Sequence, residues 1–83
     1  MPKSLTEEVA TTEQKKFELI LGGLDRMFPS GLTPRTRLKE TGFATPGSMA
    51  NRDSAGDGVE GRLVFNGKTF YPNDKLAAWL AAR

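Results

Sequence analysis

The sequence of 83 residues contains no cysteine and no histidine. Without cysteine the chain can form neither a disulfide scaffold nor a thiolate metal site, and it has no cysteine nucleophile. Without histidine it lacks the commonest general base and the commonest metal ligand. We therefore expect no enzyme activity, no metal and no cofactor. A small binding module is the class of protein that remains.

The sequence also has no strong excess of positive or negative charge and no long apolar run. Twelve Lys and Arg residues stand against ten Asp and Glu residues, and the net charge of +2 neither demands nor excludes a nucleic-acid partner. The apolar stretch 17–24 is too short to span a bilayer, and residues 1–13 lack the pattern of a signal peptide. We expect a cytoplasmic protein with no membrane partner.

The first part of the chain predicts a tail followed by one helix. Residues 1–11 are polar and without periodicity, which predicts a flexible N-terminal tail. Residues 12–28 have apolar side chains at the spacing of one helical face, which predicts an amphipathic helix. Gly22 and Gly23 each weaken this helix by roughly 1 kcal/mol relative to alanine, so we expect packing to stabilise it. The apolar residues of this face are Phe17, Ile20, Leu21, Leu24, Met27 and Phe28.

Two short helices are predicted next. Thr33-Pro34 combines a capping hydroxyl with a proline at the first helical position, and Gly42 suits a helix end, so a helix is expected over residues 34–41. Thr45-Pro46 repeats the signal and predicts a second helix through about Asp53. The spacing between the two helices is that of a helix-turn-helix.

A β-hairpin follows a glycine-rich loop. Asn66-Gly67 supplies the two positive φ angles of a type I′ turn, with β-forming residues on both sides. The two-residue turn pairs Phe65 with Lys68 and Leu63 with Phe70. A final amphipathic helix is expected to bury Leu76, Trp79 and Leu80. The predicted fold is mainly α with a small two-stranded β-hairpin, a winged helix-turn-helix with an additional N-terminal helix (12–28). It forms one domain over residues 12–83.

Three motifs in residues 32–83 resemble those of a known family. Residues 71–80 (YPNDKLAAWL) match the pattern Tyr-Pro-x-x-x-Leu-x-Ala-Trp-Leu, residues 45–52 (TPGSMANR) look like a recognition helix, and residues 54–58 (SAGDG) look like the loop that leads into a wing. With these motifs the region resembles the excisionase-like (AlpA-like) MerR-type winged-helix proteins of phages and mobile elements.

The resemblance implies a small sequence-specific DNA-binding protein. Such a protein acts as a transcriptional regulator or as an excisionase (a recombination directionality factor). Its partners would be double-stranded DNA and a recombinase or RNA polymerase.

In this interpretation the helix that begins at Thr45 lies in the major groove, where Asn51 can bond adenine and Arg52 can bond guanine. Arg35 and Lys39, four residues apart, are expected to share one helix face and contact phosphates. The hairpin tip is expected to reach a minor groove or a phosphate. The DNA-binding candidates are Arg35, Lys39, Thr45, Ser48, Asn51, Arg52, Arg62, Asn66, Gly67 and Lys68.

Several alternatives stay open at this level. The polar helix face and the Asn-Gly turn are also what a solvated, purely structural surface requires. The same fold in a phage or plasmid protein can bind and modulate another protein. The N-terminal helix either completes the core or presents an apolar face to a second copy, giving a homodimer, a dimerisation module or a cooperative assembly on DNA.

Overall fold

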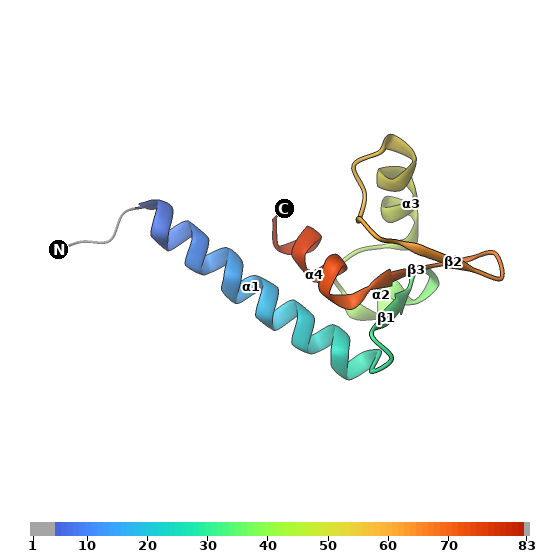
Figure 1. Cartoon of the computed structure of the whole chain (residues 1–83), viewed down its shortest axis with the longest axis horizontal. Helices are drawn as coiled ribbons and strands as arrows, with labels where there is room; N and C mark the ends of the chain where they lie inside the picture. Colours follow the sequence, from blue (N-terminus) through green and yellow to red (C-terminus); the bar gives the residue numbers. More distant parts are fainter. Residues whose placement is uncertain (1–4, 83) are drawn as a thin grey trace.

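The computed structural model describes residues 5–82 of the chain. It is mainly helical with one small antiparallel sheet, as the sequence predicts (Figure 1). In chain order the elements are α1 (Leu5–Met27), β1 (Leu32–Pro34), the 3-10 helix η1 (Arg35–Arg37), α2 (Leu38–Thr41), α3 (Pro46–Ala55), β2 (Leu63–Phe65), β3 (Lys68–Pro72) and α4 (Asn73–Ala81).

The sheet has three strands in the order β1-β3-β2, so the prediction of a two-stranded hairpin alone is wrong. The additional strand β1 pairs antiparallel with β3, and Thr33 lies opposite Tyr71. Thr33 is fully buried, and its hydroxyl donates a hydrogen bond of 2.7 Å to Asn73 Oδ1 rather than capping a helix. A strand this short shows no alternation of its own, which is why the sequence pattern did not predict it.

The helix predicted over residues 34–41 is divided in two. Pro34 has an extended backbone, η1 follows it, and α2 is a single α-helical turn. The predicted end is confirmed, because Gly42 has a φ of +77° in the left-handed conformation. Arg35 and Lys39 therefore do not share one face of one helix.

Helix α1 begins at Leu5, earlier than the expected start at residue 12, so residues 5–11 are helical rather than a tail. Residues 1–4 of that predicted tail lie outside the described part of the chain. Leu, Glu and Ala in this segment are good helix formers, and an established helix extends at low cost without apolar periodicity. Its C-terminal half packs beside α4, and its N-terminal half extends away from the body (Figure 1).

The local signals around α3 and the hairpin are confirmed. Thr45 caps α3, which continues to Ala55 rather than ending near Asp53. Strands β2 and β3 pair in the predicted register, with Leu63 opposite Phe70. The turn residues Asn66 and Gly67 have φ angles of +51° and +76°, as a type I′ turn requires.

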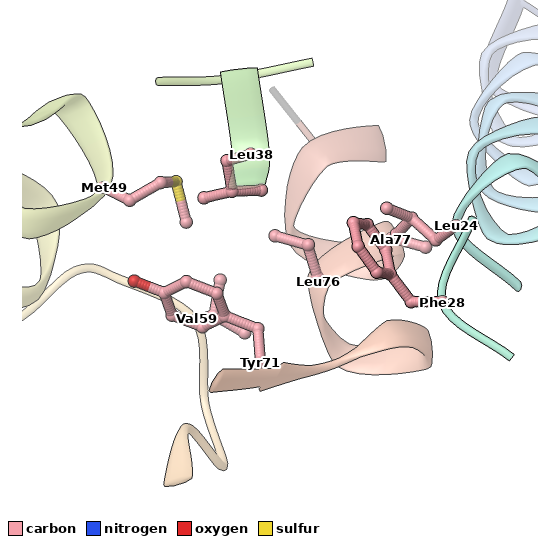
Figure 2. Close-up of a cluster of buried hydrophobic side chains, with 8 residues drawn as sticks. All are labelled: Leu24, Phe28, Leu38, Met49, Val59, Tyr71, Leu76 and Ala77. Carbon is pink, nitrogen blue, oxygen red and sulfur yellow. The ribbon is translucent and has the colours of Figure 1, made fainter. Parts of the chain in front are cut away.

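The core joins all four α-helices to the sheet (Figure 2). Leu24 of α1 and Phe28, the residue directly after this helix, are buried in it, so the N-terminal helix completes the core of the single chain. Asn73 links the start of α4 to the end of α1, because its side-chain amide donates to the backbone oxygen of Phe28 and to Asp25 Oδ1. The buried cluster consists of Leu24, Phe28, Leu38, Met49, Val59, Tyr71, Leu76 and Ala77. Trp79 and Leu80 pack against this cluster while only partly buried.

Candidate nucleic-acid interface

Helix α3 presents a polar face to solvent. Among its residues only Met49 is buried, and its side chain points into the core (Figure 2). Ser48, Asn51 and Arg52 are exposed. A short helix held by one apolar anchor therefore leaves most of its length available to another molecule.

The hydroxyls of Thr45 and Ser48 serve the start of α3. Ser48 N–H donates to Thr45 Oγ1 at 3.2 Å, and Thr45 N–H donates to Ser48 Oγ at 3.3 Å. The Ser48 hydroxyl also donates to the backbone oxygen of Thr45 at 3.0 Å. This reciprocal cap satisfies amides that the helix leaves free. On the exposed face, Asn51 and Arg52 are the longer side chains left to meet a ligand.

Asp53, on the opposite side of α3, is the centre of a buried polar cluster. Its side chain is only 6% exposed. Its Oδ2 accepts a hydrogen bond of 2.6 Å from the Tyr71 hydroxyl and another from Arg35. Arg62 Nη1 lies 3.9 Å from Oδ1, which is buried and has no hydrogen-bond partner among the described residues. The cluster thus joins α3 to η1, to the base of the β2–β3 hairpin and to the central strand β3.

Tyr71 and Arg35 complete this cluster. Arg35 Nε donates to the Tyr71 oxygen at 2.9 Å, and the guanidinium lies 5.8 Å from the centre of the Tyr71 ring. Burial raises the pKa of the Tyr71 hydroxyl, and its hydrogen bond to Asp53 raises that pKa further. The phenol is therefore a stable donor near neutral pH.

This arrangement changes the interpretation of two residues. Arg35, predicted to contact phosphate, is half-buried and holds Asp53 instead. Asp53 is not among the predicted functional residues. The signal that could have indicated its role is an acidic residue within a helix that is predicted to contact DNA. Its contacts set how α3 stands relative to the sheet, so it positions the exposed face without belonging to that face.

Two more arginines are engaged in exposed ion pairs. Arg52 Nη1 lies 3.1 Å from Asp57 Oδ2, and Arg37 forms two hydrogen bonds of 3.0 Å with Glu40. The hydrogen bond from Arg37 lowers the pKa of Glu40. Exposed pairs of this kind are screened by solvent and contribute little to stability, so a phosphate or base edge can displace the carboxylate.

The loop after α3 is tied to α4. Trp79 Nε1 donates to the backbone oxygen of Asp57 at 2.9 Å. Because Asp57 also pairs with Arg52, this contact helps to hold the Arg52 side chain over the end of α3.

The hairpin projects from the body at the end of the molecule opposite the N-terminal half of α1 (Figure 1). Arg62, Asn66, Gly67 and Lys68 are all exposed along it. Phe65 contacts Phe70 across the strands, with ring centres 5.5 Å apart. The structure thus brings the predicted tip residues together at one site, whereas Lys39 lies exposed on α2.

Comparisons with known proteins identify no relative of this chain. No family model matches the chain, and neither a curated protein nor a solved structure matches it. Within residues 5–82 there is no helix long and apolar enough to cross a membrane. The same residues contain no group of three or more side chains suited to hold a metal ion.

Proposed function

We propose that this protein binds double-stranded DNA as a winged helix-turn-helix. Helix α3 would enter the major groove and the β2–β3 hairpin would act as the wing. The observation that carries the proposal is the division of α3 into two sides. Met49 and Asp53 hold one side to the body, and the other exposes Ser48, Asn51 and Arg52.

The order of the elements supports this assignment. A helix, a strand, two helices and a hairpin follow one another, and β1 pairs with the strand that leaves the hairpin. The turn at Gly42 separates α2 from α3, as in a helix-turn-helix. The resemblance of residues 32–83 to excisionase-like proteins points to the same fold.

The activity we propose contains no chemical step. A regulator or an excisionase works through binding energy, DNA shape and the recruitment of RNA polymerase or a recombinase. Asn51 and Arg52 would read bases, each good pair contributing roughly 1–3 kcal/mol of discrimination, and Lys39 and Lys68 would contact phosphates.

The distribution of charge favours assembly of more than one copy on DNA. The net charge is only +2, and four arginines have a carboxylate oxygen within 4.0 Å. One copy therefore neutralises few phosphates, and its affinity should be modest. Binding to repeated sites, or beside a protein partner, would supply the additional affinity that one copy lacks.

The test is a titration of labelled duplexes from the DNA around the gene, followed by fluorescence anisotropy at several salt concentrations. We expect Asn51→Ala and Arg52→Ala to weaken binding to the preferred duplex by roughly 5-fold to 150-fold each. Lys68→Ala should weaken all duplexes alike and reduce the salt slope by about 1. Lys16→Ala removes the same charge from α1, far from α3, and should leave binding unchanged.

Absence of binding to every duplex at micromolar protein and low salt would overturn the proposal. Equal affinity of the wild type and of both α3 variants would overturn the role of α3. The alternative is a protein that binds and modulates another protein. The ion pairs that partly neutralise Arg37 and Arg52 favour this alternative, because they lower the positive potential of the surface.

A further inference from the structure

All three side chains of strand β2 are large, apolar and exposed. Its side chains Leu63, Val64 and Phe65 are 40%, 64% and 47% exposed. Phe70 covers one side of Phe65, and Phe65 is not part of the buried core cluster. Large apolar side chains gathered on a projecting element are typical of a contact surface.

The charges around this strand indicate what the surface contacts. No Asp or Glu occurs between Glu60 and Asp74, whereas Arg62 and Lys68 lie at the two ends of the β2 segment and its turn. Along this segment the exposed apolar side chains are accompanied in the sequence by cations and by no acid, and Asp53 Oδ1, which lies 3.9 Å from Arg62 Nη1, is buried. This combination suits a polyanion with an apolar interior. A DNA duplex has this chemistry, with phosphates outside and stacked bases within.

The place of Phe65 in the hairpin suits insertion between bases. It pairs with Lys68 directly beside the Asn66-Gly67 turn, so it is the apolar residue of β2 nearest the tip. Its contact with the Phe70 ring restricts its rotation, so less conformational entropy is lost when it enters a stack.

We propose that Phe65 is an apolar wedge that enters the minor groove and partly unstacks one base step. This inference rests on the proposed function. Proteins that insert such wedges unstack a base step and kink the duplex there. Arg62 and Lys68 would neutralise phosphates on either side of the kink. Flexible pyrimidine–purine steps deform most easily, so we expect the preferred site to hold such a step under the wing.

The experiment uses the full chain and a duplex that it binds, labelled at both ends for energy transfer and carrying 2-aminopurine at the step beneath the wing. Wild-type protein should shorten the end-to-end distance and raise the 2-aminopurine fluorescence at saturation. Phe65→Thr keeps a β-forming residue and removes the wedge. It should still bind at saturating protein, with the same salt slope, but lose more than half of both signals.

Two matched variants sharpen the test. Phe65→Leu keeps an apolar wedge and should retain most of both signals. Val64→Thr changes the other face of the same strand at nearly equal size and should leave them unchanged.

Wild-type binding without a bend, or an unchanged bend in Phe65→Thr, would overturn the wedge and leave the proposed function intact. Absence of any wild-type binding would overturn both. A dimer of wild-type protein without DNA that Phe65→Thr abolishes, measured by sedimentation, would assign β2 to a protein contact and also overturn the wedge.

Discussion

The Tyr71 hydroxyl donates a hydrogen bond of 2.6 Å to Asp53 and ties the far end of α3 to the central strand of the sheet. Arg35 donates to both of these side chains, so the three residues form one network. Together with the Met49 anchor, this network sets the orientation of the helix that we propose enters DNA. In this proposal, stability and DNA recognition depend on different sides of the same helix.

Removing the Tyr71 hydroxyl should destabilise the fold. In Tyr71→Phe the ring still packs, but Asp53 loses a donor while it remains buried, which should cost about 1–3 kcal/mol of unfolding free energy. Urea denaturation followed by the fluorescence of Trp79, the single tryptophan, measures this. Thr36→Ala, at an exposed position of η1, is the control and should stay within about 0.5 kcal/mol of wild type. Equal stability of Tyr71→Phe and wild type would contradict the network.

The ionisation of Tyr71 can be observed directly, because it is the single tyrosine of the chain. Burial and Asp53 raise its pKa above the ordinary value of 10.0. The unfolded chain therefore releases the proton at lower pH than the folded chain. The stabilisation that the protonated Tyr71 hydroxyl provides should be complete below about pH 10. It should decrease as the pH rises through the pKa of Tyr71 in the folded protein. Ultraviolet titration of tyrosinate should give a midpoint above 10 for the folded protein and near 10 in denaturant. Coincident midpoints would contradict this prediction.

Arg35 and Arg52 should differ in what their removal affects. Arg35→Ala deprives the buried Asp53 carboxylate of the arginine that is hydrogen-bonded to it and should lower stability by about 1–3 kcal/mol. Arg52→Ala breaks an exposed pair and should cost less than about 1 kcal/mol. For a domain of this size 1 kcal/mol corresponds to a Tm shift of about 4–8 °C, which calorimetry resolves. Equal Tm values for the two variants would contradict the assignment of Arg35 to the buried network.

Replacing Gly22 in α1 should stabilise the protein. Gly22 is exposed in the helix interior, and a Cβ there would meet nothing within 4 Å. Gly22→Ala should therefore add about 0.5–1 kcal/mol of stability through helix propensity. Gly42→Ala is the matched contrast, because its φ of +77° disfavours any side chain, and it should lower stability by about 1–2 kcal/mol. A destabilised Gly22→Ala would show that the open space beside α1 is occupied in solution.

Features that depend on neighbouring residues could be predicted from the sequence. The Asn66-Gly67 turn, the Thr45 cap and the left-handed Gly42 each follow from side chains within a few positions. The exposed face of α3 was predictable for the same reason, since helical spacing and one apolar anchor define it. Whether these residues contact DNA stays a prediction.

Features that join distant segments were decided by the tertiary structure. The buried bond from Thr33 to Asn73 spans 40 positions, and the bond from Tyr71 to Asp53 spans 18. Thr33-Pro34 carries a good helix-start signal, yet pairing with β3 and burial of the Thr33 hydroxyl outweigh it. The local sequence predicts an exposed cation at Arg35, whereas the fold places Asp53 and Tyr71 beside it. Local sequence determines turns and caps because their partners are near in the chain. Only packing decides which polar groups are enclosed together and must satisfy one another.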